Sequence, residues 1–334
     1  MLKAIGQLIA TADVRVREYA ALRNPWTNVY GLARSLLALG TLCTLLLNDT
    51  SKLFRPGAGV DSFPICSFAS QASIYCLLGS PHLEIARWVS IIVLLLVISG
   101  YFPRWTAIPH WWVTFSLSSS AIVVDGGDQV SSVLTLLMIP LALGDSRLNH
   151  WLAAPGEPGN LYTRWVALSA AAAIRLQVAG IYFHASIKKM QVPEWVDGTA
   201  MYYWLNSNIF GLPEQLRPLF APLLLGSTVA VATWGVVLLE LILAAALFMP
   251  SARWRPLLLL GVVFHAAIAV FMGITSFAIA MMAALVLFLT PVEHHLHLLW
   301  PMGRGRPAVG GRGASADPYA AHGRSAYDGE NGPA

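Results

Sequence analysis

Long apolar stretches separated by short polar segments run along most of this chain. An α-helix rises 1.5 Å per residue and needs about 20 apolar residues to cross a bilayer. The pattern predicts eight such helices, near residues 28–47, 86–102, 107–124, 129–144, 164–187, 219–248, 257–272 and 274–290. The spans 129–144 and 274–290 are short, and Pro140 predicts a kink in the first of them. We therefore expect an all-α fold, a polytopic membrane helix bundle of about eight transmembrane helices.

The composition also indicates a membrane protein. Charged residues make up 11% of the chain, hydrophobic residues 56%, and the mean hydropathy is +0.62. These values exclude a soluble domain with a hydrated surface. The largest loops predicted on the external side, 48–84 and 188–218, are too short to hold a separate catalytic domain. Any activity is therefore expected in the bundle and in these two loops.

Lysine and arginine residues are unevenly distributed between the two sides of the predicted bundle. With a cytoplasmic N-terminus, 13 of them lie on the cytoplasmic side and 6 on the other, while Arg34 and Arg175 lie inside spans. This asymmetry predicts a multi-pass protein of the cell membrane with both termini in the cytoplasm. It also accounts for the net charge of +4 without a nucleic-acid partner.

Three regions follow from the composition. Residues 1–27 are expected to form a cytoplasmic amphipathic segment, 28–300 the transmembrane bundle, and 301–334, rich in Gly, Ala, Ser and Pro, a disordered cytoplasmic tail. The run from Glu293 to His297 could bind a metal, but we interpret its histidines as partners of helix-terminal carbonyls and lipid headgroups, so no metal site is predicted.

Two of the three cysteines, Cys66 and Cys76, fall in the first predicted external loop. An oxidising compartment would let them join and close a short loop as a structural disulfide, with a redox-active pair as the alternative. Cys43 lies in the first span and is interpreted as a small packing residue.

The densest group of ionisable and aromatic residues follows the span 164–187. Charges at membrane depth cost about 2.5 to 3.5 kcal/mol each on insertion scales, so His184, Lys188 and Lys189 predict a wet or partnered cavity. The alternative is that the two lysines are snorkelling anchors. Arg175, Tyr182 and Lys189 are spaced by seven and are expected on one helix face. A lysine beside a partly dry cavity can act as a general base or hold an anionic partner.

Further polar groups lie within or between the other spans. Asp125 and Asp128 flank two glycines and predict either an acidic rim facing the lysine cluster or a turn in which Asp128 caps the next helix. His265 lies midway along its span, where it is either a site residue or a satisfied interior histidine. Glu240 and Arg34 are both expected in the cytoplasmic third of their spans, as a structural ion pair.

These residues resemble the SdpB-like family of bacterial membrane proteins, which matures a sporulation-delaying toxin. That family is itself similar to the membrane part of vitamin K-dependent γ-carboxylases, the HTTM group. The resemblance covers most of residues 15–300. It is carried by Tyr182-Phe183, Lys188-Lys189-Met190, Trp195-Val196-Asp197-Gly198, Phe264-His265, Met272-Gly273 and Phe277. The segments 125–128 and 198–204 and the pair Cys66 and Cys76 resemble the toxin-maturation branch in particular.

The resemblance implies a site and its partners. In the carboxylases the second lysine of the pair deprotonates a reduced quinone, a role that falls on Lys189 here. The catalytic residues expected on this basis are Lys189, His184, Tyr182, Arg175, His265, Asp125 and Asp128. The substrate-binding residues expected are Lys188, Trp195, Asp197 and Gly198. The chain lacks the large extramembrane domain of the carboxylases, which argues against glutamate carboxylation.

Three hypotheses follow for the function. The first is a membrane factor that matures an exported antimicrobial or toxin peptide precursor, assisted by a small partner protein of the same operon. The second is a quinone-dependent membrane enzyme in which Lys189 abstracts a proton. The third is a peptide exporter or immunity protein, with Arg34, Arg175 and Glu240 lining a path. Protease motifs such as H-E-x-x-H and G-x-S-x-G do not occur in the sequence.

Overall fold

The computed structural model describes residues 14, 17–57, 59, 63–122, 125–152 and 160–296. Within these ranges the chain folds into helices, eight of which are long and coincide with the eight predicted spans. They are α2 (Asn28–Leu47), α5 (Leu83–Ser99), α6 (Ala107–Ser120), α7 (Gly126–Leu143), α8 (Leu161–Lys189), α12 (Ser227–Ala245), α13 (Trp254–Met272) and α14 (Thr275–Leu289). The prediction of an all-α helix bundle is confirmed. The predicted tail, 301–334, and residues 1–13, 15 and 16 of the predicted N-terminal segment lie outside the described residues.

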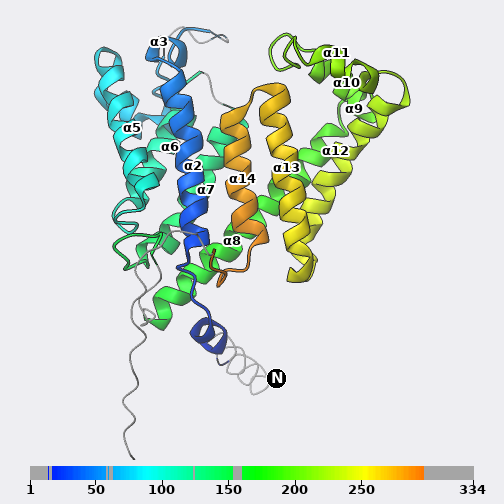
Figure 1. Cartoon of the computed structure of the whole chain (residues 1–334). Coiled ribbons are helices and arrows are strands. Elements are labelled where there is room, and N and C mark those ends of the chain that lie inside the picture. The colour runs from blue at the N-terminus through cyan, green and yellow to red at the C-terminus, as the bar shows by residue number, and fades with distance from the viewer. Residues whose placement is uncertain are drawn as a thin grey trace, which may run out of the picture. The chain divides into compact units, whose positions relative to one another are not determined.

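Short helices join the long ones. The segment between α2 and α5 contains α3 (Thr50–Leu53), η1 (Phe68–Ala72), α4 (Ile74–Leu78) and η2 (Ser80–His82). The segment between α8 and α12 contains α9 (Pro193–Val196), α10 (Ala200–Leu205), α11 (Arg217–Phe220) and η3 (Ala221–Leu224). The short helices η4 (Ala246–Phe248) and η5 (Ser251–Arg253) connect α12 to α13. Figure 1 shows that α3 and α9–α11 lie at the same end of the bundle.

Length and surface both fit a bilayer. Among the residues that the structure describes, six helical segments are long and apolar enough to cross a membrane, whereas α6 and α14 are shorter. Large apolar side chains such as Ile92, Leu238 and Val263 are exposed on outer helix faces, where lipid would cover them. The protein is therefore a multi-pass membrane protein.

Several helix boundaries have local causes. The span predicted to start near residue 219 begins as α12 only at Ser227, because Gly226 adopts a φ of +62° that a helix does not tolerate. Helix α7 starts three residues earlier than predicted, at Gly126, because Asp125 caps it. The same helix includes Pro140 and continues to Leu143.

Helix α14 is the centre of the packing. It packs against α2, α7, α8 and α13. Glycine allows two of these contacts: a Cβ atom on Gly127 would lie 2.6 Å from the Cα of Phe277, and one on Gly40 would lie 3.1 Å from the carbonyl oxygen of Ser276. A second apolar core is formed by α2, α4, α5 and α6. The two cores meet along α2, which contributes residues to both.

Cys66 and Cys76 form a disulfide that ties the segment before η1 to α4, with the two Cα atoms 5.6 Å apart. Cys43 is a free thiol.

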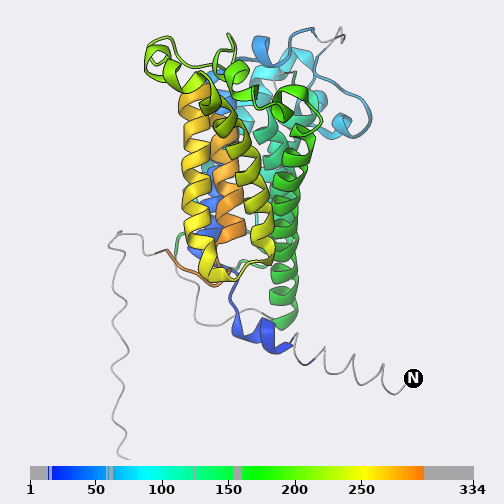
Figure 2. The ribbon, with the colours of Figure 1, turned by 90° about the vertical axis from the view of Figure 1, so that its right-hand side faces the viewer.

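Helices α8, α12, α13 and α14 make up one side of the bundle, which faces the viewer in Figure 2. Here α8 packs on α12, and α13 packs on α14. In Figure 1, α12 leans away from α13 towards the end where α9–α11 lie. The candidate site is found between these two helix pairs.

Candidate functional site

An open cavity of about 560 Å³ lies between α8 and α12 on one side and α13 and α14 on the other. Its walls are mainly apolar and aromatic, and they include Phe264, Phe277, Trp195, Trp204 and Met281. The start of α7 completes the wall with Gly126 and Gln129. This size and lining are typical of a pocket for one organic ligand or for a short part of a peptide chain.

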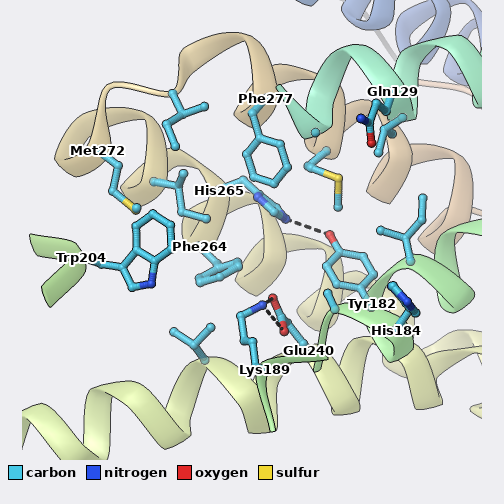
Figure 3. Close-up of a pocket in the computed structure, with 18 of the residues that line it drawn as sticks. Gln129, Tyr182, His184, Lys189, Trp204, Glu240, Phe264, His265, Met272 and Phe277 are labelled. Atoms are coloured by element: carbon cyan, nitrogen blue, oxygen red, sulfur yellow. Dashed lines mark hydrogen bonds and ion pairs between the residues drawn. The ribbon is translucent and has the colours of Figure 1, made fainter. Parts of the chain in front are cut away.

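An ion pair forms part of the cavity wall. Lys189, the last residue of α8, places its Nζ atom 2.7 Å and 2.8 Å from the two carboxylate oxygens of Glu240 on α12 (Figure 3). The side chains are 22% and 9% exposed, so the pair is largely withdrawn from solvent. The ammonium group also lies 5.2 Å from the ring centroid of Trp195 on α9. A carboxylate and an aromatic face therefore stabilise the charge of Lys189 in an apolar setting.

A second polar pair links α8 to α13. The hydroxyl of Tyr182 lies 2.8 Å from Nε2 of His265, and both side chains are buried (Figure 3). The imidazole also contacts the rings of Phe264 and Phe277. Nδ1 of His265 has no hydrogen-bond partner among the described residues. Other atoms of His265 line the cavity, whereas Nδ1 itself is covered by neighbouring side chains, so a bound ligand reaches this nitrogen only after one of them shifts.

The ion pair corrects the prediction that Glu240 pairs with Arg34. Glu240 lies 13 residues beyond Ser227, about 20 Å along α12. Helix α8 therefore ends well inside the bundle, and Lys189 meets Glu240 there. Arg34 instead donates from Nη2 to the hydroxyl of Thr106, 2.6 Å away at the start of α6.

Two other cations lie outside the cavity. Arg175 is seven residues before Tyr182, about 10 Å further down α8. It donates from Nη2 to the carbonyl oxygen of Thr290 and stacks over the ring of Trp254. Lys188 is exposed and donates to the side-chain oxygen of Gln191. The prediction that these two residues belong to the site is therefore not supported by their positions.

The two aspartates form a helix cap. Asp125, and not Asp128, is the N-cap of α7: its Oδ1 accepts hydrogen bonds from the N–H groups of Gly127 and Asp128. Its Oδ2 accepts from the hydroxyl of Ser276 on α14, 2.8 Å away. Both aspartates line a separate, smaller cavity of about 210 Å³. The expected acidic rim facing Lys189 is therefore replaced by a cap that fixes α7 to α14.

The remaining predicted residues divide between wall and scaffold. His184 and Trp195 line the cavity. Asp197 is exposed and accepts hydrogen bonds from the N–H and hydroxyl of Thr199. Gly198 has a φ of +86° and lies so close to α12 that an added Cβ would be 2.9 Å from Cβ of Ala230. The last two therefore position the α9–α10 segment against α12.

Glu240 is not among the residues predicted for the site, although the sequence indicates that it needs a partner inside the bundle. It is the one charged residue between Ser227 and Phe248, and a single carboxylate in an apolar span requires a partner. The sequence predicts that Glu240 is buried in an ion pair, but the predicted partner, Arg34, is wrong: the partner is Lys189.

Chemically, the cavity can hold a proton between Lys189 and Glu240, and its mainly apolar walls can enclose the apolar part of a ligand. Within the described ranges, no group of three or more His, Cys, Asp or Glu side chains could hold a metal ion.

Comparison with known proteins identifies the family. The HTTM domain matches residues 157–292, which include both polar pairs of the cavity. The sporulation-delaying protein SdpB of Bacillus subtilis (strain 168) is 37% identical over 284 residues, which cover 84% of this chain and 87% of SdpB. The chain belongs to the SdpB-like family of HTTM-domain proteins. A second relative, the uncharacterized protein YitO of the same organism, is 41% identical over 308 residues, covering 90% of this chain and 96% of YitO. No solved structure matches the chain.

Proposed function

We propose that this SdpB-like protein is a membrane factor that matures an exported antimicrobial or toxin peptide precursor. The observation that carries the proposal is the Lys189–Glu240 pair, held in the wall of an apolar cavity next to the Tyr182–His265 pair. Two charges at this depth carry a desolvation cost even when they are paired, and charged groups inside membrane segments are a default mark of a functional site. The relationship to the sporulation-delaying protein SdpB supports the choice of a toxin pathway.

The cavity is suited to a substrate that arrives from the lipid. Val236 and Glu240 of α12 and Ile268 and Met272 of α13 line it, while α12 and α13 diverge (Figure 1). The outer faces of both helices carry exposed apolar side chains. A ligand between these helices is therefore an apolar one, such as the hydrophobic part of a membrane-inserted precursor. Lys189 and Glu240 then supply the polar contacts that a carboxylate or amide of the precursor needs.

We place the cavity on the external side of the membrane, which follows from the predicted orientation. With both termini in the cytoplasm, the end that bears α3 and α9–α11 faces outwards. The precursor would be met as it emerges from the membrane, and a small partner protein of the same operon would present it there.

The proposal is tested by complementing a deletion strain that retains the precursor gene. We expect Lys189→Ala to abolish toxin activity in the medium, expressed per amount of the protein in the membrane, because loss of the ion pair also lowers the stability of the protein. Lys188→Ala is the matched control, because the neighbouring lysine is exposed and points to Gln191, and it should restore full activity. Full toxin activity with Lys189→Ala would refute the proposal.

A second candidate function is that of a quinone-dependent membrane enzyme, and it is favoured by a separate observation. The cavity is mainly apolar, has Phe264 and Phe277 against the imidazole of His265, and leaves Nδ1 of that imidazole without a partner. These features fit an aromatic ring that bears an oxygen. When bound, a reduced quinone supplies two electrons and the protons of its hydroxyl groups. His265 would hold its oxygen once the side chains that cover Nδ1 shift, Tyr182 would orient His265, and Lys189 with Glu240 would hold or move a proton.

This candidate has its own measurement. Solvent extracts of protein purified in mild detergent should contain a quinone in near-stoichiometric amount, and His265→Leu should lower that amount at equal protein. Quinone-free extracts from an active preparation would contradict this candidate without touching the first. The exporter hypothesis gains no support, since Arg34 and Arg175 lie away from Glu240 and do not form a path with it.

A further inference from the structure

A second buried polar cluster lies away from the cavity, where the start of α2, the start of α6 and the loop after α7 meet. Its side chains are all at most 6% exposed. It consists of Tyr30 and Arg34 from α2, His110 from α6, and Asp145, Arg147 and His150 from the loop. The proposed maturation function makes no use of these residues.

The cluster carries a positive charge that the described residues do not balance. Its one carboxylate, Asp145, is already engaged by Arg147, with Nη2–Oδ2 at 2.7 Å and Nε–Oδ1 at 2.8 Å. Burial, together with Arg34 and Arg147, lowers the pKa of His150 to about 3, so its ring is neutral at pH 7. The positive charge of Arg34 is therefore not balanced by a carboxylate of the cluster. The positive N-terminal end of α6 lies beside it at Thr106.

Four polar atoms of this cluster lack partners among the described residues. They are Nη1 of Arg34, Oη of Tyr30, Nε2 of His110 and Nδ1 of His150. Tyr30 lies one turn before Arg34 on α2, and His110 lies one turn after Thr106, the residue that accepts from Arg34. The ring centroids of Tyr30 and His150 are 6.4 Å apart. Unpaired buried polar atoms are costly, and four of them in one cluster point to a shared polar partner.

Two other arginines of the bundle provide a contrast. Arg164 is also buried, and its Nη1 donates to the carbonyl oxygens of Ala20 and Ala21. Arg175 donates to a carbonyl oxygen and stacks on Trp254. The guanidinium of Arg34 donates one side-chain hydrogen bond, to the hydroxyl of Thr106. That hydroxyl itself donates to the carbonyl oxygen of Phe102. Among these three, Arg34 is the one whose charge is not met by carbonyl oxygens or a ring.

We propose that Arg34, with the hydroxyl of Tyr30 and a ring N–H of His110, binds a small inorganic anion of halide size. The three side chains are 1 to 3% exposed, which leaves no access for a lipid headgroup and restricts the ligand to an ion that is enclosed as the helices pack. The anion neutralises Arg34 and holds α2 to α6. It is independent of the cavity and of the precursor.

Chloride is the probe that tests this site. The full-length protein in detergent is unfolded thermally in sodium chloride and in sodium gluconate at equal ionic strength. We expect chloride to raise the midpoint by several degrees and the rise to saturate, as ligand binding to the native state requires. Equal midpoints in the two salts, or no bound radiolabelled chloride at equilibrium, would overturn the proposal.

Variants separate the site from a general salt effect. Arg34→Met should remove the chloride response, whereas Arg164→Met, the matched buried arginine, should keep it. Should Arg34→Met fail to fold, Tyr30→Phe decides the matter. With a bound anion, this variant should raise the chloride concentration for half-maximal shift by about tenfold, the effect of one hydrogen bond to a charged group. Without one, removing an unpaired hydroxyl would leave that concentration unchanged, and the proposal would be wrong.

Discussion

Lys189 and Glu240 lie 51 residues apart in the sequence, yet both carboxylate oxygens of Glu240 lie within 2.8 Å of the Lys189 ammonium nitrogen. The pair joins the end of α8 to the last third of α12. It explains how a chain of this hydropathy keeps two charges at membrane depth, since each charge is the partner of the other.

Removing one member of this pair should destabilise the protein. Glu240→Leu leaves the Lys189 ammonium beside an apolar cavity, and we expect a loss of about 2 to 3 kcal/mol in the free energy of unfolding, less than for a fully buried pair because Lys189 is 22% exposed. The double variant Lys189→Met/Glu240→Met should recover most of that loss. Chemical unfolding in detergent measures both, with the exposed Glu194→Gln as control. If the double variant is no more stable than Glu240→Leu, the unpaired Lys189 ammonium is not the cause of the destabilisation.

The Tyr182–His265 hydrogen bond should matter for stability and for activity. Tyr182→Phe leaves both ring nitrogens of a buried imidazole without partners, at a cost of about 1 to 2 kcal/mol. We also expect lower toxin output per molecule, because His265 is no longer oriented in the cavity. Thermal unfolding and a toxin assay test this, with Tyr202→Phe, a half-exposed tyrosine of α10, as control. An unchanged output would remove Tyr182 from the working site.

Filling the cavity should stop maturation without unfolding the protein. Ile268 lines the cavity from α13, and Ile268→Trp adds a ring into a space of about 560 Å³. Val263, on the same helix, is 57% exposed and does not line the cavity, so Val263→Trp is the matched control. We expect toxin output to fall at least tenfold with the first variant and to stay normal with the second. Similar outputs from both would place the reaction elsewhere.

The disulfide should stabilise the segment between α2 and α5. It closes a loop with a sequence separation of 10, for which the chain-entropy relation gives about 3 kcal/mol. The double variant Cys66→Ser/Cys76→Ser should lower the unfolding free energy by about that amount. In the unsubstituted protein, denatured without a reductant, alkylation should label one cysteine thiol. After reduction it should label all three. Three labelled thiols before reduction would contradict a disulfide in the mature protein.

Hydropathy was enough to predict the eight long helices, because the bilayer selects long apolar segments and most of the helix ends lie near a polar residue or a glycine. The depth at which each helix ends was not predictable in the same way. Lys189 was expected at the external end of a span, whereas α8 starts at Leu161 and ends beside Glu240. Hydropathy does not encode how two tilted helices are offset along their axes.

The candidate site was predicted only in part, because the sequence does not show which helices pack against one another. Tyr182, His184, Lys189, Trp195 and His265 share one cavity. The sequence places the first four in a single segment, but His265 comes from α13, and only packing brings it to Tyr182. The aspartate turn shows the converse: its spacing fits an acidic site, yet the carboxylates are used as a helix cap and a contact to Ser276.

The central claim is that the cavity receives the peptide precursor, and photo-crosslinking in cells tests it most directly. A benzophenone amino acid at position 268 faces the cavity, and one at 263 faces outwards. In cells that mature the toxin, we predict a covalent adduct with the precursor from position 268 and none from position 263. Active cells that give no adduct from position 268, or equal adducts from both positions, would contradict the account.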